Sequence, residues 1–188
     1  GHLLLTAALF RTEKTNARVT TGAGSAAVTN LEGEQRVDGI ELGMAGNFGE
    51  RLSLFGGYTW LDTEIVSSPD PNQVGKSLPN VAERSFSLQA RYQWTDAFAI
   101  GGTASYASEI NGGTVFATST EIPDWWRGDL FAEYRFTAGL SARLNVLNIT
   151  DETYAWWSDV RGLGAATTVA DAYTQPGRNF SLSLTFKY

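Results

Sequence analysis

The sequence of 188 residues contains no cysteine and a single histidine, His2. Without cysteine the chain has no disulfide framework, no cysteine-ligated zinc or iron–sulfur centre and no thiol nucleophile. One histidine also leaves little material for a metal site or a catalytic triad. We therefore expect no enzyme, no resident metal and no cofactor.

Cationic residues are scarce as well. The chain has 14 Lys and Arg against 20 Asp and Glu, which gives a formal net charge of -6. A protein that binds nucleic acid neutralises phosphates with an excess of positive charge, and the charge of this chain has the opposite sign. Nucleic acid is therefore not an expected partner.

No run of apolar residues approaches the length of about 20 that a transmembrane helix requires. The mean hydropathy is -0.17. That value does not separate a soluble protein from a transmembrane β-barrel, because barrel strands alternate apolar and polar residues. The distinction must come from the order of the residues.

The sequence does contain a strict alternation of apolar and polar residues. Its last segment, residues 180–188, has a large apolar side chain at every even position and a polar one at every odd position. A period of two places alternate side chains on opposite faces of a β-strand. The same pattern predicts eight strands, near residues 3–15, 35–48, 51–63, 83–94, 97–110, 125–136, 139–148 and 178–188.

The connections between these strands alternate in length. Long segments at 16–34, 64–82, 111–124 and 149–177 alternate with tight turns at Gly49-Glu50, Thr95-Asp96 and Thr137-Ala138. Outer-membrane barrels have short periplasmic turns and long outer loops, and an even number of strands leaves both chain ends on the periplasmic side. We therefore expect an all-β fold, with residues 1–188 forming a single antiparallel transmembrane β-barrel or part of one.

The two faces of the predicted strands differ in composition. The polar face consists mostly of Gly, Ser, Ala, Thr and Asn, and it lacks the apolar volume to fill a closed interior. The apolar face carries aromatic residues near strand ends, as membrane boundaries favour. These are Phe48, Trp60, Trp94, Phe136 and Tyr188. We expect this face to meet lipid, and the alternative is the core of a soluble β-sandwich.

Five segments resemble the late barrel strands of TonB-dependent siderophore receptors, especially those of the catecholate type. They are residues 9–18 (LFRTEKTNAR), 37–42 (VDGIEL), 75–82 (GKSLPNVA), 144–154 (LNVLNITDETY) and 176–178 (PGR) with the strand that follows. The segments span nearly the whole chain and occur in the order in which the family has them.

The resemblance implies that the chain belongs to a larger barrel. Receptors of this family have 22 strands and a plug, with a TonB box at the N-terminus. These residues would then be the last eight strands, with the plug, the TonB box and the first fourteen strands absent. The resemblance also implies the bacterial outer membrane, contact with its lipid and lipopolysaccharide, and uptake of a ferric siderophore by the parent receptor. TonB would be reached only through the missing N-terminal part.

The resemblance further implies that the barrel-assembly machinery reads the final strand through Phe180, Leu182, Leu184, Phe186 and Tyr188. Two architectures remain open. Either the chain is part of a receptor barrel, or it closes alone as eight strands and serves as an anchor, adhesin or engineered scaffold. A third possible architecture is a larger ring formed by two copies of the chain. An interior rich in Gly and Ser fits a wide, plugged lumen better than a narrow, packed one.

Two aromatic pairs are candidates for a ligand-binding outer mouth. Trp125-Trp126 and Trp156-Trp157 lie where long loops meet strands, with Arg127 and Arg161 close in sequence. Stacking and positive charge suit an anionic, ring-rich ferric chelate. The other interpretation of the four tryptophans is the outer aromatic girdle of the barrel.

Charged residues of the polar face form a candidate ladder, Glu41, Arg91, Asp129, Glu133, Arg135 and Arg143. Opposite charges on neighbouring strands pair across a sheet, and such a ladder would line the barrel interior or an ion or solute path.

A further candidate site consists of four residues of the segment 144–154, namely Asn145, Asn148, Asp151 and Tyr154. Because Asn and Asp at strand ends satisfy turn backbone groups, we expect a structural role for them.

Overall fold

The computed structural model describes residues 2–21, 28–111, 121–162 and 168–187 of the chain. Its regular elements are all β-strands. Among the described residues no helix has the length and apolar character needed to cross a membrane. The all-β prediction is therefore confirmed.

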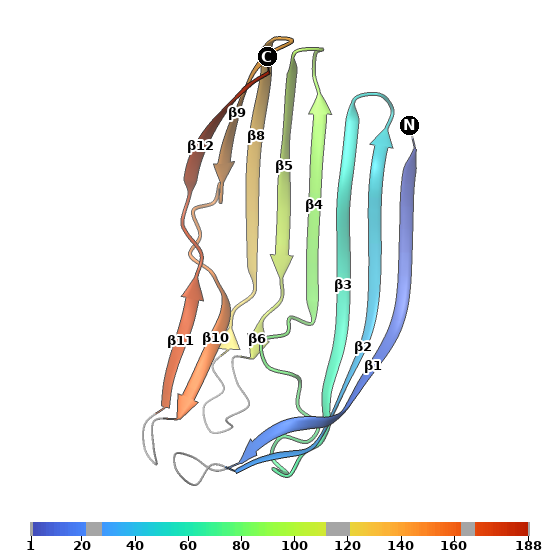
Figure 1. Ribbon diagram of the computed structural model, residues 1–188, viewed down its shortest axis with the longest axis vertical. Coiled ribbons are helices and arrows are strands. Elements are labelled where there is room, and N and C mark those ends of the chain that lie inside the picture. The colour runs from blue at the N-terminus through green and yellow to red at the C-terminus, as the bar shows by residue number, and fades with distance from the viewer. Residues whose placement is uncertain (1, 22–27, 112–120, 163–167, 188) are drawn as a thin grey trace.

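Eight strands form one antiparallel sheet (Figure 1) in the order β1-β2-β3-β4-β5-β8-β9-β12. The strands are β1 (Leu3–Thr21), β2 (Val28–Phe48), β3 (Leu52–Ser67), β4 (Arg84–Gln93), β5 (Phe98–Ala107), β8 (Trp125–Thr137), β9 (Leu140–Leu147) and β12 (Asn179–Phe186). Each corresponds to one of the eight strands predicted from alternation. Each also pairs with its neighbour in that series, as in a simple meander.

The three short connections all lie at one end of the sheet, together with both chain ends (Figure 1). They join Phe48 to Leu52, Gln93 to Phe98 and Thr137 to Leu140. Gly49 has a φ of 70°, in the left-handed region that tight hairpin turns require and glycine adopts without strain. The predicted sorting of short and long connections is therefore confirmed. We call this end of the sheet the short-turn end, and the opposite end the long-loop end.

The segments expected as loops contain additional strands. β1 and β2 continue beyond the predicted boundaries, to Thr21 and from Val28. The link between β5 and β8 contains a small hairpin, β6 (Ile110–Asn111) paired with β7 (Glu121–Ile122). The link between β9 and β12 contains a longer hairpin, β10 (Ala155–Gly162) paired with β11 (Thr168–Thr174). These four strands escape prediction because their residues do not alternate large apolar with polar side chains.

The sheet is open. β1 and β12 lie at its two opposite edges (Figure 1), and within the described residues each pairs with a single neighbour in that sheet. The sequence allowed a closed eight-stranded barrel as an alternative, and this is not the arrangement observed.

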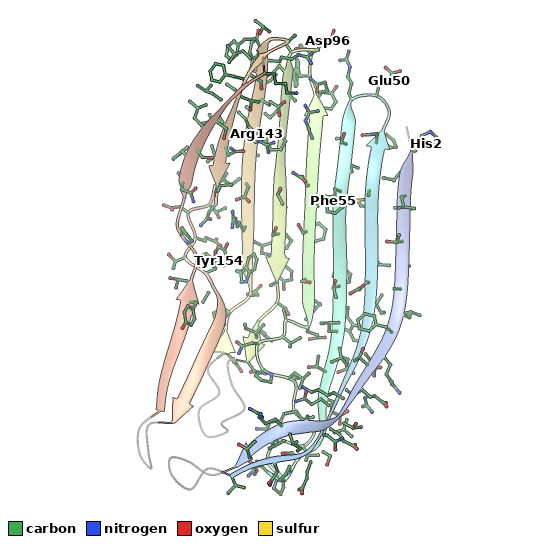
Figure 2. All side chains as sticks on the ribbon, in the orientation of Figure 1. His2, Glu50, Phe55, Asp96, Arg143 and Tyr154 are labelled. Atoms are coloured by element: carbon green, nitrogen blue, oxygen red, sulfur yellow. The ribbon has the colours of Figure 1, made fainter. Side chains whose placement is uncertain are left out.

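The register aligns apolar residues across all eight strands. Between the short turns and the register shifts near Lys14 and Glu34, even-numbered residues of β2, β3, β4, β5, β8, β9 and β12 lie on the same side as odd-numbered residues of β1. We call this side the apolar face and the opposite side the polar face. Many large side chains of the apolar face are exposed (Figure 2), such as Leu9 (81%), Leu182 (67%) and Phe186 (68%). In a sandwich, a second layer would bury these side chains, so the soluble-sandwich alternative is wrong.

Aromatic residues gather in two bands on the apolar face. Near the long-loop end the ring centroid of Trp126 lies 6.3 Å from that of Phe86 and 4.7 Å from that of Tyr106. Near the short-turn end the contacts are Tyr92 with Trp94 and Tyr134 with Phe136. On β8, the ten positions between Trp126 and Phe136 correspond to about 33 Å of strand. At a tilt of about 40° they span about 25 Å, the apolar height of an outer-membrane barrel.

Candidate functional site: the long-loop end of the polar face

The predicted tryptophan pair at the start of β8 is divided between the two faces of the sheet. Trp125 and Trp126 are successive residues of one strand, so their side chains point in opposite directions. Trp126 lies on the apolar face, is 53% exposed and joins the aromatic band with Phe86 and Tyr106. Its surroundings match the girdle interpretation rather than the ligand-binding one.

Trp125 lies on the polar face and stacks on Tyr154, with ring centroids 4.5 Å apart and an interplanar angle of 26°. It also lines a cavity of about 170 Å³, together with Ile110 and Ile122 of the hairpin β6–β7. Tyr154 is buried (8% exposed) and does not line this cavity, so the Trp125 ring alone, held in place by the stack, is the aromatic surface that faces it. A rigidly held ring is a suitable surface for another ring.

Arg127 connects the two aromatic rings to a carboxylate. Its Nη1 donates to Tyr154 Oη at 3.2 Å, and its Nε donates to Asp129 Oδ1 at 2.8 Å. The side chains of Arg127 and Asp129 retain 28% and 21% exposure. We call Trp125, Arg127, Asp129 and Tyr154 the mouth cluster. It holds one guanidinium, paired and partly exposed, beside the Trp125 ring and the buried Tyr154 ring on which it stacks.

Asn148 fixes the segment that carries Tyr154. It is 1% exposed, has a φ of 53°, and its Nδ2 donates to the carbonyls of Glu152 at 2.8 Å and Pro176 at 3.3 Å. Its own backbone N–H donates to Asp129 Oδ1 at 2.8 Å. The expected role of Asn148 in satisfying turn backbone groups is therefore confirmed. The same bonds tie both ends of the β10–β11 hairpin segment to the sheet.

Trp156, Trp157 and Arg161 lie in the backbone of β10, but their side chains are outside the described residues. Their assignment to an outer mouth stays a prediction. Tyr154, which the motif included without a ligand role, is the member of the mouth cluster that the site prediction missed. Its contact with Trp125 spans 29 positions, and nothing in the local sequence indicates it.

The predicted charge ladder is partly assembled. Arg91 Nη2 lies 3.9 Å from Glu133 Oε1, and Glu133 is directly opposite Arg143 in the register of β8 and β9. Arg143 instead donates to Asn145 Oδ1 at 2.9 Å and places its guanidinium 3.9 Å from the ring centroid of Phe131.

The other three ladder residues lie apart from this group. Asp129 belongs to the mouth cluster, and Arg135 Nη2 donates to the carbonyl of Asp96 at 2.5 Å. Glu41 lies opposite Thr59, without a charged partner in the described part of the chain. The role of the ladder as an ion or solute path stays a prediction.

The residues predicted as an assembly signal all lie on the apolar face of β12, except Tyr188, which is outside the described residues. Phe180, Leu182, Leu184 and Phe186 are between 56% and 68% exposed. This placement leaves the side chains accessible but does not show what reads them. In the described residues no three His, Cys, Asp or Glu side chains are grouped so as to hold a metal ion.

The family of the chain follows from comparison with known proteins. Residues 1–149 match the family described as TonB dependent receptor-like, beta-barrel. The chain belongs to this family. The resemblance seen in the five sequence segments is thereby confirmed, and so is the bacterial outer membrane as the location of the chain.

Two relatives illustrate the similarity. The probable TonB-dependent siderophore receptor PiuA of Acinetobacter baumannii is 31% identical over 198 residues, covering 100% of this chain and 25% of the relative. The catecholate siderophore receptor Fiu of Escherichia coli K12 is 36% identical over 155 residues, covering 81% of this chain and 20% of the relative.

Solved structures give the same result. The crystal structure of the siderophore receptor PiuA from Acinetobacter baumannii has a TM-score of 0.83 at 30% identity, over 100% of this chain and 26% of that chain. The closed form of the ferric-catecholate import receptor Fiu from Escherichia coli K12 has a TM-score of 0.78 at 31% identity, over 98% and 25%. The chain thus spans about a quarter of the length of the proteins it matches.

Proposed function

We propose that the chain forms the last eight strands of the barrel wall of a transport receptor, not an enzyme, that takes up a ferric siderophore. The open sheet supports this, because its edge strands β1 and β12 each leave one side unpaired within the described residues. Unpaired edges of long strands require a neighbour, and further strands of a larger barrel supply one. The plug and the TonB-binding box of such a receptor would lie outside these residues.

The observation that carries the ligand proposal is the orientation of Trp125. Its ring faces the polar side at the long-loop end, stacked on Tyr154 and beside Arg127, whereas the adjacent Trp126 faces the apolar side. A ferric catecholate is anionic and rich in rings, so a rigidly held tryptophan ring beside a guanidinium matches its chemistry. The relatives PiuA and Fiu, described as siderophore and catecholate siderophore receptors, agree with this ligand class.

The adjacent tryptophans provide the test and its matched control. Full-length protein, produced from the gene that encodes this chain, is assayed in iron-limited cells for uptake of radioactive iron as a ferric catecholate complex. Trp125→Leu should raise the KM for uptake about fivefold to tenfold, because loss of an aromatic contact is worth about 1 kcal/mol. Trp126→Leu should leave KM within about twofold, since its ring lies on the other face.

Protein levels in the outer membrane are compared for both variants by immunoblotting. Absence of any catecholate-dependent uptake by the unmodified protein would refute the proposed function. An equal KM change in the two variants would refute the assignment of Trp125 while leaving the receptor function standing.

A further inference from the structure

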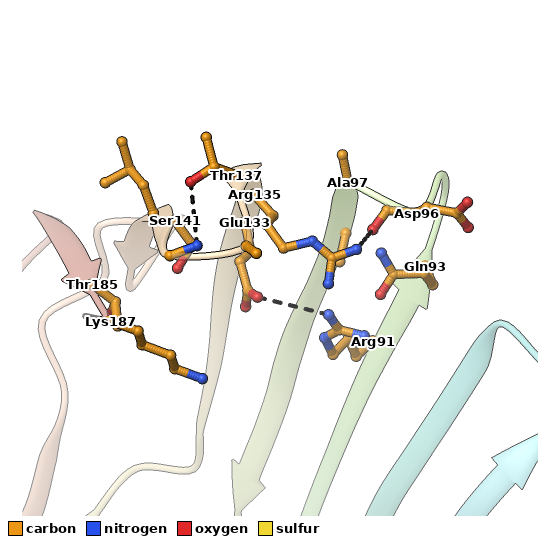
Figure 3. Close-up of a pocket in the computed structure, with 14 residues that line it drawn as sticks. Arg91, Gln93, Asp96, Ala97, Glu133, Arg135, Thr137, Ser141, Thr185 and Lys187 are labelled. Carbon is orange, nitrogen blue, oxygen red and sulfur yellow. Dashed lines mark hydrogen bonds and ion pairs between the residues drawn. The ribbon is translucent and has the colours of Figure 1, made fainter.

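A cavity of about 260 Å³ lies at the short-turn end of the polar face (Figure 3). Asp96, which lines it, is well separated along the sheet from Tyr154 of the mouth cluster (Figure 2). The walls of the cavity come from β4, β5, β8, β9 and β12, near the turns that join them. Nothing in the proposed siderophore function uses this cavity. Its lining contains more positively than negatively charged residues.

Three cationic side chains line the cavity: Arg91, Arg135 and Lys187. Two acidic residues, Glu133 and Asp96, line it as well, and Figure 3 shows the carboxylate of Asp96 directed away from Glu133 and Lys187. The chain as a whole has a net charge of -6. An excess of positive charge in a hollow of an acidic chain focuses a positive potential there.

The cations keep most of their hydrogen-bonding capacity free. Arg135 donates one hydrogen bond from Nη2 to the backbone carbonyl oxygen of Asp96, which carries no net charge. Arg91 Nη2 lies 3.9 Å from Glu133 Oε1, a long distance for an ion pair. The Lys187 ammonium has no bonding partner among the residues that the structure describes. Ser141 and Thr185 add hydroxyl groups to the same lining.

We propose that this cavity binds an oxyanion, a carboxylate or phosphate group. Guanidinium forks from Arg91 and Arg135 match the paired oxygens of such a group, and the Lys187 ammonium supplies a third charge. The group is either a free anion or an acidic side chain of a separate polypeptide. Both sources present the same chemistry to the same three cations.

Two probes distinguish the sources. Binding of inorganic phosphate to the purified full-length protein in an uncharged detergent is followed by ³¹P line broadening, and binding of a tetraglutamate peptide is followed by calorimetry. Arg135→Gln and Lys187→Gln should each weaken binding about tenfold, the usual effect of removing one charge-assisted hydrogen bond. Arg135→Lys should recover part of the loss because it retains the charge.

Arg51→Gln is the matched control, since Arg51 lies at the same short-turn end and bonds to the Trp94 carbonyl but does not line the cavity. The Arg51→Gln protein should bind phosphate and the tetraglutamate peptide with affinities within twofold of those of the unmodified protein. Heat-modifiable gel migration verifies that each variant is folded. Phosphate binding that depends on the cavity cations identifies a free anion, and binding of the peptide alone identifies a protein-borne carboxylate. Failure of both probes to bind, or an equal loss in Arg51→Gln, would overturn the proposal.

Discussion

The apolar and polar faces of the sheet differ in how their side chains are satisfied. On the apolar face, Leu182 and Phe186 stand in rows and stay 67% and 68% exposed. On the polar face, many charged and polar side chains bond sideways to one another. Phe131 of this face is only 7% exposed, with Arg143 over its ring, whereas Phe55 of the same face is 66% exposed. The polar face therefore completes much of its own bonding. The apolar face depends on hydrocarbon from outside the chain.

The largest expected effect comes from a charge placed on the apolar face at mid-height. Leu130, which is 48% exposed on β8, lies between the two aromatic bands. Leu130→Arg should lower the free energy of unfolding by about 2–4 kcal/mol in phospholipid vesicles, the cost of a guanidinium in the middle of the bilayer. Urea titration followed by tryptophan fluorescence measures the change.

Thr103→Arg is the matched control, because Thr103 lies on the polar face directly opposite Asp129. The new guanidinium would meet water and a carboxylate, so a change below about 1 kcal/mol is expected. Equal losses in the two variants would erase the distinction between the faces.

The second-largest expected effect on the free energy of unfolding comes from Asn148, whose side chain holds the turn after β9. Asn148→Ala removes the bonds to the Glu152 and Pro176 carbonyls and leaves an alanine at a φ of 53°. The substitution also removes two bonds that Asn148 Oδ1 accepts, from Thr150 Oγ1 and from the Glu152 N–H, each at 3.3 Å. We expect a loss of about 2–3 kcal/mol, mostly from the two bonds to the carbonyls at about 1 kcal/mol each, with smaller contributions from the other two bonds and from backbone strain. Asn148→Gly removes the same side-chain bonds but adopts this φ without strain. In the same urea titration its loss of unfolding free energy should be smaller than that of the alanine variant by about 1 kcal/mol. A loss greater for glycine than for alanine would contradict this account of the turn.

The sequence predicted the sheet well because each of its strands alternates large apolar side chains on one face with small or polar side chains on the other. It did not predict β10 or β11, whose residues lack that period. For the site, the alternation already separates Trp125 from Trp126, since adjacent strand residues face opposite sides. The stack of Trp125 on Tyr154 is different, because it depends on how the segment after Asn148 folds back onto β8.

A comparison of two glycines tests the packing within the polar face. A Cβ at Gly101 would collide with the Ala90 carbonyl and the Phe131 ring, whereas one at Gly57 would meet only the Leu42 carbonyl at 3.4 Å. Gly101→Ala should therefore cost about 1–2 kcal/mol of unfolding free energy, as overpacking does. Gly57→Ala should be neutral or slightly stabilising because alanine loses less entropy on folding. If Gly101→Ala proves neutral, the close contact of Phe131 with β5 is wrong.

The smallest expected effect concerns the charge ladder. The side chains of Arg91 and Glu133 are 37% and 35% exposed and their charged atoms are 3.9 Å apart. A double-mutant cycle with Arg91→Met and Glu133→Gln should give a coupling below about 1 kcal/mol, typical of a solvated pair. A coupling above 2 kcal/mol would show that the ladder is a buried network.

The most direct test of the central claim, that the apolar face meets lipid, uses the absence of cysteine from the chain. Single cysteines replace Ser87, Leu88, Gln89 and Ala90 in turn on the central strand β4, and each carries a nitroxide spin label in phospholipid vesicles. Labels at 88 and 90 should collide with lipid-dissolved oxygen, and labels at 87 and 89 with a water-soluble nickel complex. Collisions with the nickel complex at 88 and 90 would contradict the account.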